Sequence, residues 1–283
     1  MKKTLEDPIK EFLKSGSGKA GGILLLIMFG ISILVVTTYP FDFGPRIWND
    51  PSNWADNPKT KPPLWIGFLS GDTFSHQTLK SSRPSDTKIT GSTVTETFSL
   101  NFQIDSDVLP TFTSFTITNV TFHREPAFAS LSIIRPDGYN LMLFRHLFSP
   151  LRAGETLPVS RNAEEPLRVL LSGDEFASQS VANFFQKEFE VPLNQIPDSF
   201  ETAIFGKPSD TMNGKFDVLK GNYEMRARFV FNDSRDKVSG LQLTLGGTNF
   251  GAIGTDHWGR DLAIGLAAGF PIALMIGLVT SLI

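Results

Sequence analysis

The stretch AGGILLLIMFGISILVVTTYPF, residues 20–41, carries no charged side chain over 22 positions. At about 1.5 Å per residue, a helix of this length crosses a hydrocarbon core of ~30 Å. Nineteen residues precede it and no small-x-small cleavage site ends it, which favours a transmembrane helix over a cleaved signal peptide. Residues 262–283 form a second uncharged run of the same length. We therefore predict a membrane protein with two transmembrane α-helices.

The composition excludes several classes of function. The formal net charge is −3, with 26 basic and 29 acidic side chains, so no nucleic-acid partner is expected. The absence of cysteine excludes disulfide scaffolds, thiolate catalysis, thiolate zinc sites and cysteine-bound iron–sulfur clusters. The four histidines follow no metal-ligand spacing, and no Gly-x-Ser-x-Gly sequence occurs. We predict no enzymatic activity, no catalytic residue, no metal site and no cofactor.

The segment before the first helix predicts the orientation of the chain. Residues 1–19 form a basic tail, and lysines close to a first span stay in the cytoplasm. The region between the two helices is then extracytoplasmic, in a multi-pass protein of the cell membrane. Ile9, Phe12 and Leu13 recur on one helical face, which predicts a short amphipathic helix along the inner membrane surface. A disordered charged tail is the alternative interpretation.

The region between the spans divides into a linker rich in Pro and Trp, residues 42–65, and a β-rich domain, residues 66–253. In the domain, apolar and polar side chains alternate with the two-residue period of half-buried strands. Arg135-Pro136-Asp137-Gly138 predicts a hairpin turn, because Pro sets one turn dihedral and Gly accepts a positive one. Many strands at this spacing predict an antiparallel β-sandwich. The alternating apolar positions are Phe98, Leu100, Phe102 and Ile104; Phe115, Ile117, Val120 and Phe122; Tyr223, Met225, Ala227, Phe229 and Phe231; and Leu241, Leu243 and Leu245.

Two short helices are expected to interrupt the strands. Ser172 followed by Glu175 is the pattern of a capping box, before a helix that ends near Phe189. A shorter helix is expected after Asp198, with Glu201 in its first turn.

The β-rich domain also contains candidate surface sites. Asn119 and Asn232 each begin an Asn-x-Ser/Thr sequence, so both are possible glycosylation sites. Asp233 and Asp236 lack the remaining ligands of a calcium loop, so we interpret them as acids of a turn.

The join between domain and second span, residues 254–261, has the composition of a helix entry. Thr255, Asp256 or Asp261 is suited to cap the exposed amides, and Arg260 to reach lipid headgroups or pair with an acid. Within the following span, residues 262–283, small residues at helical spacing predict close helix packing in lipid. The glycines in question are Gly265, Gly269 and Gly277.

The eight residues of the join also carry a family resemblance. Gly254-Thr255-Asp256-x-x-Gly259-Arg260-Asp261, followed by Gly269 and Leu274-x-x-Gly277-Leu278, resembles the start of the second transmembrane helix in C-type permease subunits of dipeptide/oligopeptide ABC importers. The basic tail and the first span ending in Tyr39-Pro40-Phe41-Asp42 look like the same subunits. The linker is similar to that of archaeal members with a large extracytoplasmic insertion. The family commonly has Arg after the matched Gly269, whereas Pro271 stands near that position here.

The resemblance implies a permease subunit of an ATP-driven importer of peptides or similar small solutes. The implied partners are a second permease subunit, separate ABC ATPase subunits, a solute-binding protein, membrane lipid and the peptide substrate. Family members continue through further spans, so we expect this chain to correspond to the N-terminal part of such a subunit or to one half of a split permease. The alternative hypothesis is a membrane-anchored binding or cell-surface protein whose β-sandwich is the functional part.

Overall fold

The computed structural model describes residues 14–209 and 215–283, which form two compact units. The helical unit consists of Met1–Leu64 and Phe250–Ile283, and the sandwich unit consists of Trp65–Asn249. The amphipathic helix predicted around Ile9, Phe12 and Leu13 lies outside the described residues.

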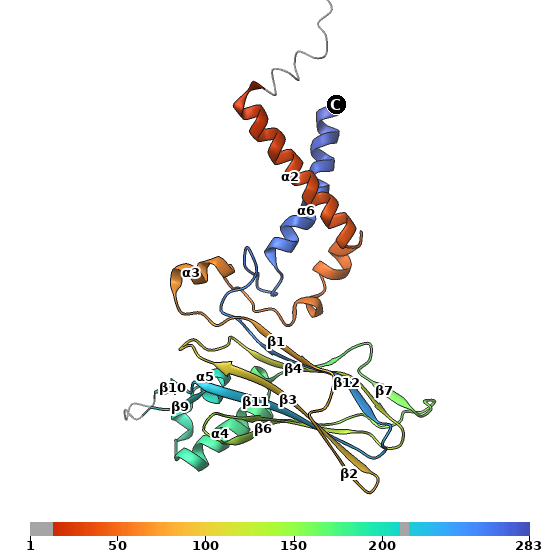
Figure 1. Cartoon of the computed structure of the whole chain (residues 1–283), viewed down its shortest axis with the longest axis vertical. Helices are drawn as coiled ribbons and strands as arrows, with labels where there is room; N and C mark the ends of the chain where they lie inside the picture. The colour runs from red at the N-terminus through yellow and green to blue at the C-terminus, as the bar shows by residue number, and fades with distance from the viewer. Residues whose placement is uncertain (1–13, 210–214) are drawn as a thin grey trace, which may run out of the picture. The chain divides into compact units, whose positions relative to one another are not determined.

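The sandwich unit contains two five-stranded antiparallel sheets, visible as two layers in Figure 1. In the first sheet β12 lies between β1 and β4, and both β7 and β8 pair with the other edge of β4. The second sheet has the order β2-β3-β11-β5-β6. The first sheet comprises β1 (Gln77–Ser81), β4 (Thr113–Phe122), β7 (Val159–Arg161), β8 (Leu167–Leu170) and β12 (Lys237–Leu245). The second comprises β2 (Asp86–Thr90), β3 (Thr93–Ile104), β5 (Phe128–Ile134), β6 (Asn140–Leu147) and β11 (Gly221–Phe231).

The predicted alternation of apolar side chains is confirmed, and it builds the core. Every apolar position named above for β3, β4, β11 and β12 is buried, and side chains of both sheets belong to one hydrophobic cluster. Burial of such side chains contributes roughly 1.5–3 kcal/mol each. The mainly-β sandwich predicted from the sequence is therefore the observed architecture of this unit.

The strand β4 contains an irregularity that explains its uneven apolar spacing. Ile117 and Val120 are both buried although they are three residues apart, which a regular strand does not allow. Asn119 between them has φ of 47°, and its N–H donates to the Asn162 carbonyl at 2.9 Å instead of to β12. The register is unchanged here, since Gly240 pairs with Thr118 and Val238 with Val120, so both strands share the irregularity and Val238 and Leu241 of β12 are buried at the same three-residue spacing. The glycosylation candidate Asn119 thus lies within a strand.

One of the two predicted helix starts is wrong by two residues. Helix α4 (Glu175–Phe189) is capped by Asp174, whose carboxylate accepts the Ala177 N–H at 2.8 Å. Ser172 cannot cap it because residues 171–173 form a short 3₁₀ turn (η4), and its hydroxyl donates to Glu201 at 2.5 Å. Helix α5 (Phe200–Ile204) follows Asp198 as expected, is capped by Ser199 and has Glu201 in its first turn. The remaining short elements of this unit are η3 (Leu64–Ile66), which begins at the last residue of the helical unit, α3 (Gly67–Ser70), η5 (Leu193–Gln195), β9 (Gly206–Pro208) and β10 (Phe216–Val218).

The helical unit contains two helices that are long and apolar enough to cross a membrane. They are α2 (Gly16–Thr38) and α6 (Leu262–Leu282), and they pack against each other. The segment after α2 forms a π-helical turn, η1 (Gly44–Trp48), and a 3₁₀ turn, η2 (Pro51–Trp54).

A buried arginine holds the predicted β5–β6 hairpin turn against α5. The turn is confirmed by a Gly138 N–H to Arg135 carbonyl bond of 3.0 Å and a φ of 85° at Gly138. The Arg135 side chain is fully buried and forms an ion pair with Asp137 at 2.8 Å. It also donates to the carbonyls of Ile204 (2.6 Å) and Gly206 (2.8 Å), where α5 ends. One guanidinium therefore satisfies the last carbonyl of the short helix and the first carbonyl of β9, which follows it.

We expect Arg135→Met to lower the free energy of unfolding by about 3 kcal/mol, because it leaves buried carbonyls without donors. Arg226→Met is the matched control, since Arg226 makes a similar two-residue ion pair with Glu224 on an exposed sheet face. That substitution should cost less than about 1 kcal/mol. Urea denaturation followed by circular dichroism measures both, and equal losses would contradict the assigned role of Arg135.

Candidate functional site

Residues 254–261, here called the entry loop, fold into a closed turn before α6. Thr255 and Asp261 form an isolated antiparallel bridge. The Leu262 N–H donates to the Gly254 carbonyl at 3.1 Å, and the Gly259 N–H donates to the Asp256 carbonyl at 3.0 Å. The loop therefore begins and ends at the first turn of the helix.

The centre of the entry loop is the mostly buried pair of Asp256 and Arg260. One Asp256 carboxylate oxygen accepts the N–H groups of Trp258 (2.9 Å) and Arg260 (3.0 Å), and the other accepts Arg260 Nε at 2.6 Å. The guanidinium carbon lies 4.5 Å from the centroid of the Trp258 ring and 4.5 Å from that of Trp48. Burial raises the pKa of Asp256, but these hydrogen bonds outweigh it and the net pKa is lowered. The carboxylate is thus held in its charged form.

The entry loop is joined to the linker by a second set of hydrogen bonds. Thr255 Oγ1 accepts the Lys61 N–H at 3.0 Å and donates to the Pro58 carbonyl at 2.7 Å. The Thr60 N–H donates to the Asp256 carbonyl at 2.8 Å, and Asn57 Nδ2 donates to the Gly259 carbonyl at 2.9 Å. We call the combined structure, residues 54–64 with 250–261, the clasp.

Two motif glycines permit the close approach of backbone to backbone in the clasp. Gly254 has φ of 93°, and a Cβ there would lie 2.5 Å from the Lys61 carbonyl oxygen. Gly259 has φ of 85°, and a Cβ there would lie 2.9 Å from the Trp54 carbonyl oxygen. Both positions therefore require glycine for conformation and for space.

Of the three predicted caps, Asp261 is the residue that caps α6, accepting the Ala263 N–H at 2.8 Å. Thr255 and Asp256 instead bind the linker and Arg260. Arg260 pairs with an acid, which was one of its two expected roles. All six motif residues thus belong to one hydrogen-bonded structure.

The three glycines predicted to pack helices differ in their surroundings. The Trp48 ring occupies the place that a Cβ at Gly265 would take. Gly269 and Gly277 have no described atom within 4 Å of an added Cβ, so their role in packing stays a prediction. A mostly apolar cavity of about 310 Å³ lies beside Gly265 and Gly269. Its other walls include Val35, Tyr39, Phe43 and Trp48.

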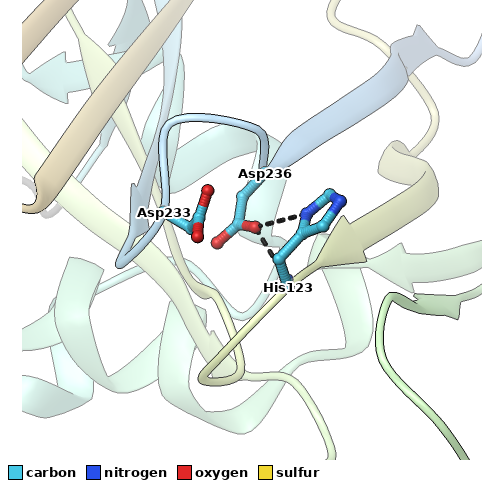
Figure 2. A group of neighbouring side chains, drawn as sticks. All are labelled: His123, Asp233 and Asp236. Atoms are coloured by element: carbon cyan, nitrogen blue, oxygen red, sulfur yellow. Dashed lines mark hydrogen bonds and ion pairs between the residues drawn. The ribbon is translucent and has the colours of Figure 1, made fainter.

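In the sandwich unit the structure brings together His123, Asp233 and Asp236, with ligand-type atoms within 4.8 Å of one another (Figure 2). His123 follows β4, and the two acids lie in the turn between β11 and β12. One Asp236 oxygen accepts the His123 N–H at 2.8 Å and lies 3.0 Å from its Nδ1. The other Asp236 oxygen is buried and has no hydrogen-bond donor within the described part of the chain.

The surroundings of Asp233 argue against a metal site at this cluster. One Asp233 oxygen accepts the Arg235 N–H (3.1 Å) and Nε (2.8 Å). The other faces Arg235 Nη2 at 2.8 Å and Arg124 Nε at 3.3 Å. The Arg235 hydrogen bonds, with the charges of Arg235 and Arg124, lower the pKa of Asp233, and four N–H groups surround its two oxygens. We interpret the cluster as a brace that holds the β11–β12 turn against the end of β4.

Sequence reasoning treated Asp233 and Asp236 as turn acids but did not place them beside His123. The pairing of Lys237 with Thr121 puts Asp236 next to His123 across the sheet. Only the register of β4 against β12 would have revealed this proximity. Next to the brace, the glycosylation candidate Asn232 donates to Glu125 at 2.7 Å.

A polar groove of about 710 Å³ lies along residues 146–167 of the sandwich unit. Arg161, in its wall, binds Glu155 with two hydrogen bonds of 2.8 and 2.6 Å and donates to the carbonyls of Ser149 and Pro150. The hydrogen bonds from Arg161, helped by the Arg152 N–H, hold the pKa of Glu155 at about 2, below its ordinary 4.5. The ion pair thereby shapes the loop that forms one side of the groove.

Comparison with known proteins gives no family. No protein-family model and no curated protein matches the chain. One similar solved structure is described as "Structural basis for the promiscuous specificity of the carbohydrate-binding modules from the beta-sandwich super family". It shares 10% identity over 68% of this chain, and the match spans 62% of that structure's length. Its TM-score of 0.22 is too low to carry an argument, so the sandwich assignment rests on the strand pairing itself.

Gly254→Ala should destabilise the clasp by about 2 kcal/mol, because it combines a positive φ with overlap of the Lys61 carbonyl. Gly269→Ala is the control, since that helical glycine has open space around it and alanine favours helix. Thermal unfolding in detergent, followed by tryptophan fluorescence, reports on Trp48, Trp54 and Trp258 near the clasp. Unchanged midpoints for both variants would contradict the assigned role of Gly254.

A pH dependence follows from Glu155. Because its pKa is lower in the folded state than in the unfolded state, ionised Glu155 stabilises the fold above pH 4.5. This contribution is lost as the pH falls from 4.5 towards 2. The difference in thermal midpoint between wild type and Glu155→Gln should shrink as the pH falls over that interval. The difference between wild type and Arg161→Gln should shrink in the same way. A difference that is constant with pH would refute the assignment.

Proposed function

We propose that the chain is part of a permease subunit of an ATP-driven importer of peptides or similar small solutes. In this proposal α2 and α6 cross the cell membrane, the N-terminus is cytoplasmic and the sandwich unit is extracytoplasmic. ATP hydrolysis belongs to separate ATPase subunits. The carrying observation is the clasp, in which the motif from Gly254 to Asp261 links the linker to the start of α6.

The clasp favours a transport role for the chain over a role as a simple membrane anchor. An anchor requires only an apolar helix of sufficient length. Here each motif residue has a defined structural role. Gly254 and Gly259 allow backbone contact, Asp256 and Arg260 hold the turn, and Asp261 caps α6. Such a structure sets the position and direction of α6 relative to the linker, as a helix lining a path requires.

Two helices do not enclose a translocation path, so the proposal requires partners. A second permease subunit and further helices would pack against the small residues Gly269 and Gly277, which have open space around them. The sandwich unit would be the surface that receives a solute-binding protein. Peptide, as substrate, and lipid complete the set of expected partners.

The second candidate function is a membrane-anchored binding protein. It is favoured by an open groove of about 610 Å³ on the outer face of the second sheet. The groove is lined by polar side chains of β3 and β11, including Asn101, Gln103, Asn222 and Glu224. In this case the sandwich unit would bind its ligand in the absence of any transporter subunit.

Purification from native membranes, with an affinity tag on this chain, distinguishes the two proposed functions. We expect an ABC ATPase and a second permease subunit to be recovered in constant ratio, and we expect Gly254→Ala to reduce that ratio relative to the wild-type chain. Mass spectrometry of the complex gives both measurements. Repeated recovery of the intact chain without any ATPase would rule out the permease function.

A further inference from the structure

Residues 64–71, Leu-Trp-Ile-Gly-Phe-Leu-Ser-Gly, form an uncharged segment that exposes large apolar side chains. They make up η3, α3 and the glycine that follows. Phe68 is 90% exposed, Leu69 is 80% exposed and Trp65 is 54% exposed. Side chains of this size are normally buried in a sandwich of this kind, so their exposure requires an explanation.

The backbone of the segment is held so that these side chains do not reach the core. A Cβ at Gly67 would lie 2.5 Å from the Asn249 side chain, so the chain passes directly over that buried residue. Gly71 then ends α3 with φ of 86°. The apolar side chains are thus presented by a fixed turn rather than by a loose loop.

Chain connectivity keeps the start of the segment close to the start of α6. The Leu64 N–H donates to the Gly251 carbonyl at 2.9 Å, and Gly254 accepts the Leu262 N–H at 3.1 Å. The three Cα–Cα steps from Gly251 to Gly254 span at most ~11 Å. Leu64 therefore lies within roughly 20 Å of the first residue of α6, and Phe68 follows only four residues later.

We propose that Trp65, Phe68 and Leu69 insert into the outer interfacial layer of the bilayer that α2 and α6 cross. The inference rests on the membrane topology of the proposed function. Trp favours the headgroup level, and Phe and Leu favour the acyl boundary below it. The contact would be a third attachment of the chain to the membrane, made by the sandwich unit.

The size and chemistry of the segment favour lipid over a protein partner. Stable protein interfaces bury above ~1,000 Å² and carry a polar rim with hydrogen bonds. Three large side chains on an uncharged turn are too small a surface for such an interface, whereas shallow insertion into lipid needs only apolar area.

The test uses the absence of cysteine from the full chain, which makes every introduced thiol unique. Phe68→Cys is compared with Ile89→Cys, an apolar residue of β2 that is also exposed, at 67%. Each thiol receives a nitroxide label in the protein reconstituted into phosphatidylcholine/phosphatidylglycerol liposomes. Paramagnetic resonance then compares collision with oxygen, which concentrates in the bilayer, and with a water-soluble nickel complex. We expect position 68 to favour oxygen and position 89 to favour nickel.

A third label, at Leu26→Cys in the exposed middle of α2, separates failure of this inference from failure of the topology. If position 26 lies in the bilayer while position 68 resembles position 89, lipid insertion is wrong and the topology stands. Shielding of position 68 from both reagents would indicate a protein contact and would also overturn the inference. A water-exposed position 26 would overturn the topology and the inference together.

Discussion

The carboxylate of Asp256 accepts two backbone N–H groups and the guanidinium of Arg260, and the start of α6 depends on this contact. A buried carboxylate is stable only when its lone pairs are satisfied, so the turn from Asp256 to Arg260 has few alternatives. Stacking of Arg260 between Trp48 and Trp258 extends the constraint to the segment after α2. Residues about 200 positions apart in the chain are thereby held together before α6 begins.

Polar groups inside the sandwich unit likewise join separate elements through hydrogen bonds and ion pairs. Arg135 satisfies carbonyls at the end of α5, and Glu201 accepts the hydroxyl of Ser172 beneath the first sheet. Asp233 is paired with two arginines, and we interpret it as supporting a turn rather than binding a metal. These charged side chains could be mistaken for catalytic or metal-binding residues in the sequence. In the fold they connect secondary-structure elements.

The candidate site could be predicted in part. Gly254, Asp256, Arg260 and Asp261 lie close together in the chain, so their joint role in a helix entry was accessible from the sequence alone. Their contacts with Asn57, Lys61 and Trp48 were not, because no local pattern relates the linker to a loop some 200 residues later. The cluster of His123 and Asp236 was missed for the same reason, since it exists only through strand register.

Hydrophobic periodicity is a local property of the chain, and it was enough to predict the two apolar helices, the sandwich class and the buried faces of β3 and β11. The β5–β6 turn was predictable as well, since Pro136 and Gly138 restrict the backbone directly. The residue that caps each helix depends on tertiary contacts, because the hydroxyls of Ser172 and Thr255 form hydrogen bonds with distant residues instead of capping a helix. The irregularity of β4 at Asn119 and the joining of the linker to α6 by the clasp also depend on partners far away in the chain. These choices depend on competition among distant hydrogen-bond partners, which a linear pattern does not record.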